Sequence, residues 1–175
     1  MDAPSIPAWV FTVEPYEGES ISHFLGRFRR ANYSTLNEIA QKTGLGGVLA
    51  RWEKFRFIPP PTPKQLAALA EIVQLDVEQL TPLFPQGVSM KHEPIRLCAA
   101  CYAEQPYHRM EWQFKITSGC NRHQLRLLSE CPNCGKRFKI PALWVEGHCH
   151  NCQMLFVEMS KVSEGDVGQV APLTN

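Results

Sequence analysis

Four short cysteine and histidine pairs in the second half of the sequence have the spacing of metal ligands. Within each pair, two other residues lie between the two ligands. The eight side chains are Cys98, Cys101, Cys120, His123, Cys131, Cys134, Cys149 and Cys152. A Cys-x-x-Cys turn directs two sulfur atoms at one ion, and a structural zinc ion takes four such ligands in a tetrahedron. The four pairs therefore predict two structural Zn²⁺ ions.

The same ligand count argues against catalysis. A catalytic zinc ion keeps one coordination position open, usually beside three protein ligands, whereas four ligands at each site leave none open. The sequence also lacks a phosphate-binding glycine loop, a Gly-x-Ser-x-Gly elbow and a His-Glu-x-x-His motif. We therefore expect no enzyme activity and no small-molecule substrate.

The remaining histidines are weaker candidates for ligands. His148 and His150 flank Cys149, and either could replace a cysteine at the second site. The Cys-x-x-Cys geometry already closes that site, so surface positions are favoured for both. His92 and His108 have no metal-ligand partner nearby in sequence and are expected to face solvent.

The four pairs can share two ions in two ways. Adjacent pairs give one site of three cysteines and a histidine, followed by a site of four cysteines; interleaved pairs give the cross-brace of a RING finger, a ubiquitin-ligase module. A cross-brace brings its middle pairs close together in sequence, but seven residues separate His123 from Cys131. The stretch HQLRLLSE, residues 123–130, is expected to form two helical turns. Adjacent pairing is favoured.

Composition places the chain in a reducing compartment. An odd total of seven cysteines argues against a simple disulfide framework, and the acidic, proline-containing N-terminus does not resemble a signal peptide. No stretch reaches the roughly 18 to 20 apolar residues of a membrane helix. We expect a prokaryotic cytoplasmic protein without membrane contact. Its formal charge of +1 argues against a general nucleic-acid binder.

Hydrophobic periodicity predicts three short helices in the first half. Residues 20–32 place apolar side chains at helical spacing after Ser20, a favoured N-cap residue. Residues 34–44 contain a Thr-x-x-Glu capping box and end at Gly44. Residues 47–55 continue the pattern. Three short helices joined by tight turns resemble a helix-turn-helix unit.

A proline-rich run separates two further helices from these three. The sequence IPPPTP, residues 58–63, cannot continue a helix because proline lacks an amide hydrogen. Thr62 and Gln65 then form a second capping-box pattern around Pro63, and Asp76 can cap a last short helix.

Together these signals predict a mainly α-helical, helix-turn-helix-like N-terminal domain, followed by two small metal-stabilised zinc-ribbon modules that add a little β-structure. The expected segments are an extended arm (1–18), the helical domain (19–85), a linker (86–96), a first zinc finger (97–129), a second zinc ribbon (130–158) and a disordered tail (159–175).

Basic residues gather in the helical domain. Between residues 27 and 56 there are seven Lys or Arg against two acids, which suits nucleic-acid phosphate or an acidic protein face. A solvated helix face explains the same residues equally well. The aromatic neighbours Trp52, Phe55 and Phe57 would offer stacking surfaces for unpaired bases, but a place in the core or as anchors of a protein interface is favoured for rings at helical spacing. The candidate contact residues are Arg27, Arg29, Arg30, Lys42, Arg51, Trp52, Lys54 and Arg56.

Two stretches resemble one known family. The sequence WQFKITSGCNRHQLRLLSECPNCGKRF (112–138), with LCAACY upstream, resembles the zinc-finger region of the TniQ/TnsD family of transposon target-selection proteins. ESISHFLGR (19–27) is similar to the opening motif of that family, although His23 and Phe24 replace its usual small polar residue and tryptophan. The resemblance spans about residues 15–155.

This resemblance implies a non-enzymatic adaptor that connects target recognition to a TnsC-like AAA+ ATPase, which recruits the transposase. Longer family members continue into a DNA-binding region, whereas 23 residues follow Cys152 here. The short form is similar to the TniQ proteins of CRISPR-associated transposons. The implied partners are the ATPase filament and an RNA-guided CRISPR effector complex, with a possible contact to guide RNA or target DNA. A self-sufficient helix-turn-helix DNA-binding regulator and a RING-like ubiquitin ligase are the alternatives.

Overall fold

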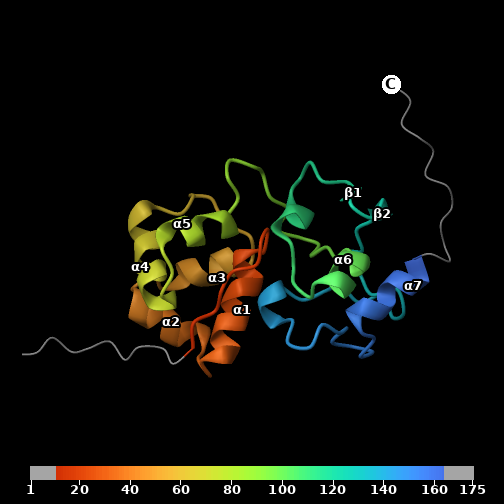
Figure 1. Ribbon diagram of the computed structural model, residues 1–175, viewed down its shortest axis with the longest axis horizontal. Coiled ribbons are helices and arrows are strands. Elements are labelled where there is room, and N and C mark those ends of the chain that lie inside the picture. Colours follow the sequence, from red (N-terminus) through yellow and green to blue (C-terminus); the bar gives the residue numbers. More distant parts are fainter. Residues whose placement is uncertain (1–10, 164–175) are drawn as a thin grey trace, which may run out of the picture.

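A computed structural model describes residues 11–163 of the chain (Figure 1). Its first half is helical, and its second half consists of short helices, 3-10 turns labelled η and a two-stranded antiparallel hairpin. The predicted mainly α-helical class with two small cysteine-rich modules is confirmed. In order, the elements are α1 (Ile21–Ala31), α2 (Leu36–Thr43), α3 (Gly47–Glu53), α4 (Pro63–Val73), α5 (Val77–Leu80), η1 (Thr81–Leu83), α6 (Ala99–Glu104), η2 (Met110–Gln113), β1 (Gly119–Cys120), β2 (Leu125–Arg126), η3 (Pro141–Leu143), η4 (Phe156–Glu158) and α7 (Met159–Ser163).

The helix boundaries follow the capping signals in the sequence. The Ser20 hydroxyl accepts a hydrogen bond from the His23 amide at the start of α1. Thr35 begins α2 with a complete capping box, and Gly44 ends it in the left-handed conformation that favours glycine. Thr62 forms a second capping box at the start of α4. All these predictions are confirmed.

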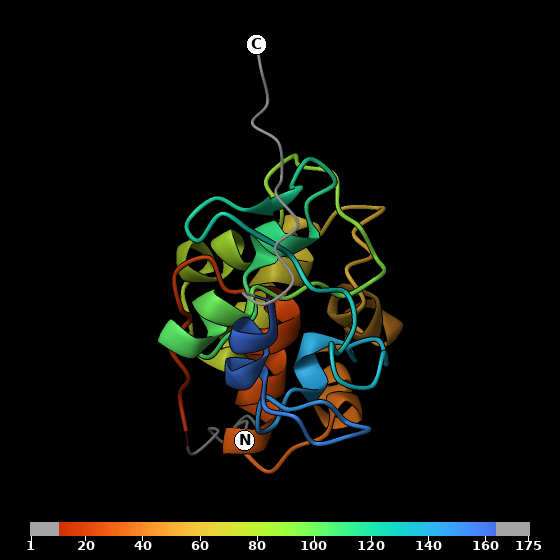
Figure 2. The same ribbon diagram turned by 90° about the vertical axis from the view of Figure 1, so that its right-hand side faces the viewer.

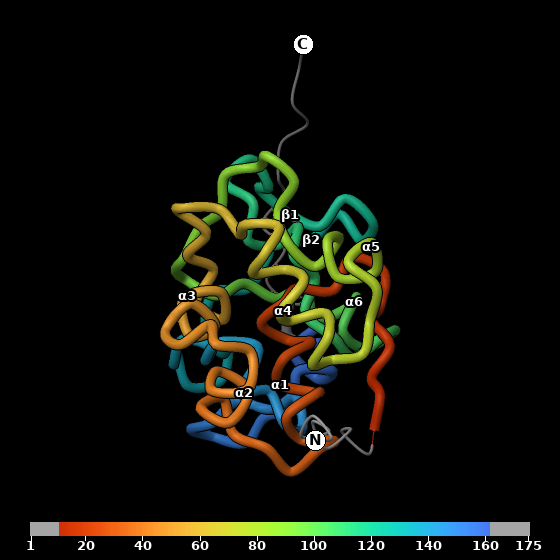
Figure 3. The backbone as a smooth tube through the Cα atoms, turned by 90° about the vertical axis from the view of Figure 1, so that its left-hand side faces the viewer, coloured from red at the N-terminus to blue at the C-terminus, as the bar shows by residue number. Residues whose placement is uncertain are grey.

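Helix α1 lies between the two halves. Figure 1 shows α2–α5 on one side of it and the cysteine-rich half on the other, with η3 directly against α1. Figure 2 views the molecule from the cysteine-rich side, and Figure 3 views the opposite face, formed by α2, α3 and α4. Buried apolar residues from both halves form one continuous core, which extends along the chain from Ile21 to Met159.

The prediction of two helical turns in residues 123–130 is wrong. The chain reverses immediately after Cys120, so that β2 pairs with β1 and Leu125 lies opposite Cys120. The reversal occurs because Cys120 and His123 occupy the two sides of one tight turn, in which Gln124 has a positive φ of 55°. A hairpin therefore replaces the expected helix.

The segments expected to be a linker and a tail also contribute to the packed structure. Met90 forms a β-bridge with Phe114, and the buried Arg96 donates hydrogen bonds to the carbonyls of Phe114 and Thr117, so residues 86–96 are held against the metal-binding half. Residues expected to begin the tail form α7, with Met159 fully buried. The remainder of the expected tail, 164–175, lies outside the described residues, as do residues 1–10 of the expected arm.

Within residues 11–163, none of the helices combines the length and the apolar character that crossing a membrane requires.

Candidate metal centres and the joint between the halves

The first candidate metal centre is formed by two turns that face each other. Cys98 is the N-cap residue of α6 and Cys101 lies in its first turn, while Cys120 and His123 come from the β1–β2 hairpin. The Nδ1 atom of His123 lies 3.2 Å from Cys101 Sγ and 3.8 Å from Cys98 Sγ. Cys101 Sγ and Cys120 Sγ are 3.5 Å apart. All four donor atoms lie within 4.8 Å of one another.

The second centre consists of two similar turns. In one, the Cys131 amide donates to the Lys136 carbonyl, and in the other the Cys149 amide donates to the Met154 carbonyl. The sulfur atoms of Cys131 and Cys152 are 3.6 Å apart. A second cross-pair, Cys134 and Cys149, is separated by 3.5 Å.

These distances fit a tetrahedral zinc ion. With Zn–S bonds of about 2.3 Å, the edge between two ligand sulfurs is about 3.8 Å, close to the observed separations. A disulfide would bring the sulfurs to about 2.05 Å, and all seven cysteines are free. Each group joins adjacent pairs in the sequence, as predicted, and not the interleaved pairs of a RING finger. The donor sets therefore fit two closed structural sites.

Glu104 supports the first centre and was not found from the sequence. Its carboxylate lies 2.7 Å from His123 Nε2 and also pairs with Arg122 at 2.7 Å. The hydrogen bond with Glu104 raises the pKa of His123 and holds its Nδ1 toward the three sulfurs. Carboxylates in this position orient metal-binding histidines. The sequence pattern that could have revealed Glu104 is its position three residues after Cys101, which places both side chains on the same face of α6.

Hydrogen bonds at the second centre favour thiolate forms. A side-chain hydrogen bond from Asn133 and the backbone amide of Met154 lower the pKa of Cys152 to about 6. The backbone amide of Lys136 similarly lowers the pKa of Cys134, whereas burial raises that of Cys131. Thiolates are the form that binds metal.

The other histidines lie outside both donor groups. His148 points toward Glu146 at 3.7 Å, and His150 is exposed. His92 is exposed as expected, with Nδ1 2.8 Å from the Phe55 carbonyl. The expectation for His108 is wrong, because its side chain is fully buried. Aromatic rings explain this burial, since Phe55, Trp112 and Trp144 lie within 5.5 Å of its ring centre.

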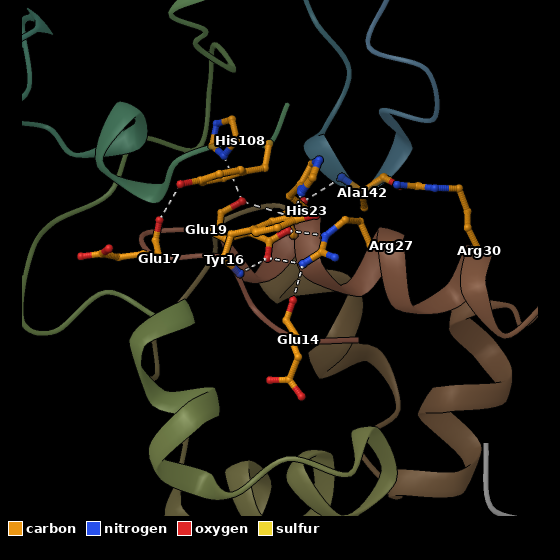
Figure 4. A network of polar contacts seen from close by, with 12 residues as sticks. Glu14, Tyr16, Glu17, Glu19, His23, Arg27, Arg30, His108 and Ala142 are labelled. Atoms are coloured by element: carbon orange, nitrogen blue, oxygen red, sulfur yellow. Dashed lines mark hydrogen bonds and ion pairs between the residues drawn. The ribbon is translucent and has the colours of Figure 1, made fainter. Parts of the chain in front are cut away.

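A polar joint, defined here as Glu19, Ser20, Ser22 and His23 with their partners His108 and Ala142, connects the start of α1 to the second half (Figure 4). Ser20 donates its amide to the His108 carbonyl at 3.1 Å, and its hydroxyl lies 2.9 Å from His108 Nδ1. Ser22 accepts a hydrogen bond from the Ala142 amide at 3.2 Å. The joint therefore connects residues about 90 and 120 positions apart through buried contacts.

Glu19 organises the N-terminal side of the joint. Its fully buried carboxylate accepts two hydrogen bonds from Arg27, at 2.6 and 2.8 Å, and lies 2.5 Å from His23 Nδ1. Arg27 also lies over the Tyr16 ring at 4.1 Å. Burial alone would raise the pKa of Glu19, but the hydrogen bonds from Arg27 and His23 outweigh it and lower the pKa. The pair therefore stabilises an ionised carboxylate inside the fold.

Two buried histidines make the joint sensitive to acid. Burial lowers the pKa of His23, and burial is also the largest cause that lowers the pKa of His108 well below its ordinary value. Both rings are therefore held neutral in the fold, whereas the unfolded chain protonates them below about pH 6.5. The contribution of these two histidines to the free energy of unfolding is therefore fully present above about pH 6.5 and is lost progressively as the pH decreases.

We expect His108→Gln to make unfolding less dependent on pH. One proton taken up on unfolding changes stability by about 1.4 kcal/mol per pH unit, so the slope between about pH 6 and pH 5 should decrease by up to that amount. Glutamine removes the titration while keeping an amide that can bond to Ser20. Urea unfolding at several pH values would measure the slope, with His92→Gln as the exposed control. Parallel curves for wild type and His108→Gln would contradict the prediction.

A comparison with protein-family models identifies this arrangement. The model of the TniQ family matches residues 10–127, which include α1–α5, the first metal centre and every residue of the joint except Ala142. The chain belongs to the TniQ family. It is therefore a transposition-associated protein, in which the second cysteine group lies beyond the matched region. No curated protein matches the chain.

Four of the basic residues predicted to contact a partner form ion pairs or hydrogen bonds within this TniQ protein. Arg27 pairs with Glu19, and Arg29 pairs with the buried Glu53. Arg30 donates to the Ala142 carbonyl at 3.0 Å, and Arg51 donates to the Ile58 carbonyl. Their role in a partner contact remains a prediction, but the bonds show that they contribute to the fold.

The other candidates divide into one buried residue and three exposed ones. Trp52 is 2% exposed and packs edge-on against Phe84 at 4.9 Å, so its ring lies in the core. Lys42, Lys54 and Arg56 are exposed. The TniQ chain thus retains a smaller set of accessible cations in this region than its sequence suggested.

Proposed function

We propose that this TniQ-family chain is a non-enzymatic adaptor in RNA-guided DNA transposition. It binds a TnsC-like AAA+ ATPase assembly on target DNA and links that assembly to a CRISPR effector with its guide RNA. The family match over residues 10–127 is the observation that carries the proposal. The continuous core and the polar joint support it, because they make both halves one body, as a protein that bridges two partners needs.

Two structural Zn²⁺ ions are part of the proposal. Zinc at the first centre is held by the three cysteines and His123, and zinc at the second by the four remaining cysteines. Each ion stabilises the turns that supply its ligands, and neither supplies catalysis because all four positions are taken by protein. The ions maintain the surfaces that partners contact.

We expect Glu104→Gln to weaken zinc binding at the first centre. The amide would still reach His123 but would lack the charge that strengthens the histidine as a ligand, and losing such a partner typically costs 10- to 100-fold in affinity, about the effect we expect here. Chelator competition monitored by zinc release would measure it. Glu111→Gln provides a control, because Glu111 is exposed and belongs to neither donor group. Equal zinc release from both variants would contradict the role of Glu104.

A self-sufficient DNA-binding regulator is less well supported. That function needs a markedly basic surface, whereas four arginines of the helical half bond internally. A RING-like ligase is not favoured either, because the cysteine groups join adjacent pairs.

The adaptor function can be tested by mixing the zinc-loaded protein with the TnsC-like ATPase, ATP and duplex DNA. We expect it to co-sediment with the ATPase filament and to appear on it by electron microscopy. Omitting the ATPase should leave the protein in the supernatant with little DNA bound. Tight DNA binding without the ATPase, and no association with the filament, would support the regulator instead.

A further inference from the structure

A basic groove crosses the boundary between the two halves. It has a volume of about 500 Å³, and its lining comes from the end of α3, from the segment before α6 and from the second cysteine-rich module. Four cations line it, Lys54 and Arg56 from the helical half and Arg137 and Lys139 from the second half, against one carboxylate, Glu93.

Two similar triplets hold these cations in place. Phe55 lies between Lys54 and Arg56 and is 0% exposed, while Phe138 lies between Arg137 and Lys139 and is 7% exposed. Each buried ring fixes its segment in the core and leaves the two flanking cations exposed. The two buried rings therefore fix the backbone from which all four cations project.

The four cations are available for a ligand. None of them forms an ion pair with another residue in the described part of the chain, in contrast to Arg27 and Arg29. Unpaired cations that line the same groove repel one another, and a bound polyanion relieves that repulsion. The chain as a whole carries a formal charge of only +1, so this concentration of charge is local.

We propose that the basic groove binds a single strand of nucleic acid through its phosphodiester backbone. Each half of the molecule contributes two of the cations, which suits one strand lying along the boundary, and a volume of about 500 Å³ is too small to admit a duplex. Phe138 is buried and cannot stack on a base, so recognition is by charge and is independent of sequence. The apolar lining residues Ile95, Ile140 and Leu143 provide contacts for the sugars.

An acidic peptide is the competing occupant, and the charge pattern disfavours it. A nucleic-acid strand carries one charge on every residue, so it can meet the cations of both halves along its path. A peptide would need a run of acidic residues to do the same.

The test is fluorescence anisotropy with the zinc-loaded full chain and labelled oligouridylate and oligothymidylate of about 15 nucleotides, within the usual site size of single-strand binders. The groove variant is Arg56→Gln with Arg137→Gln, and the matched control is Lys64→Gln with Lys115→Gln, two exposed cations outside the groove. Losing two phosphate contacts should reduce the salt slope by about 1.4 and weaken binding about 25-fold near 0.1 M salt.

Wild-type affinity in the control and the expected loss in the groove variant would support the proposal, and the tighter oligomer would identify RNA or DNA as the natural strand. Equal affinity of both variants, tighter binding of duplex DNA or of polyglutamate, or no binding at low salt would overturn it. The inference rests on the proposed adaptor function only for the presence of nucleic acid in the assembly. Because isolated oligomers are used, its failure is distinguishable from failure to join the ATPase filament.

Discussion

Replacing Cys131 by serine is expected to remove one of two zinc ions and to unfold the second cysteine-rich module. Serine is a poor zinc ligand, so the three remaining cysteines cannot close the site. Binding of structural zinc contributes about 10 to 16 kcal/mol to the folding of small zinc domains, more than the whole stability of an ordinary domain. The module has little regular structure of its own to compensate, since its residues 130–158 contain the two short 3-10 turns η3 and η4 and neither an α-helix nor a named strand.

The loss should extend to the interface with the helical half. Trp144 and Phe156 pack edge-on at 4.8 Å, and both contact Tyr102 of α6. Ala142, which bonds to Ser22 and Arg30 of α1, belongs to the same module. Unfolding it would therefore expose the Tyr102 ring on α6 and the face of α1 that contacts η3, and it would promote aggregation.

Zinc content measured by mass spectrometry should decrease from two ions to one per chain, and thermal unfolding should begin at a lower temperature. His150→Ala is the matched control, since His150 is exposed beside Cys149 but lies outside the donor group. It should keep two ions and the wild-type unfolding curve. A Cys131→Ser protein that retained both ions would show that the ligand assignment is wrong, with His150 or His148 as the replacement ligand.

The features that the sequence predicted are local ones. Ser20, Thr35 and Thr62 cap their helices through residues three positions away, and each Cys-x-x-Cys turn is closed within a few residues. Interactions between residues so close in sequence can be predicted from residue types and spacing alone. The hairpin after Cys120 was missed because HQLRLLSE has helical composition, and the turn imposed by Cys120 and His123 overrode it.

The polar joint could not be predicted for the opposite reason. Ser20 and His108 are 88 residues apart, and neither belongs to a periodic pattern that would mark it as buried. Likewise, charge counting could not separate Arg29, which pairs with buried Glu53, from Arg56, which is exposed. Long-range pairing decides which cations are free for partners, and that information appears only in the folded chain.

Gly26→Ala is expected to separate the two halves, although alanine normally favours a helix. A Cβ atom at position 26 would lie 2.3 Å from the carbonyl oxygen of Ala142 and 2.7 Å from its Cα. Both are backbone atoms of η3, which the Ser22 and Arg30 bonds hold against α1, so the clash cannot be relieved by a side-chain rotation. Overpacking typically costs about 1 to 3 kcal/mol, and a backbone clash should lie at the upper end.

For a chain of this length, a loss of about 3 kcal/mol lowers the melting temperature by about 6 to 12 °C, which differential scanning calorimetry would measure. Gly47→Ala is the matched control, because Gly47 is also helical and its added Cβ would meet nothing within 4 Å. Alanine there should raise stability by about 0.4 to 1 kcal/mol, through the smaller entropy of the unfolded chain. Destabilisation by Gly26→Ala together with stabilisation by Gly47→Ala would locate the effect in the contact between α1 and η3. If Gly26→Ala instead stabilised the protein as Gly47→Ala should, the two halves would not be in direct backbone contact.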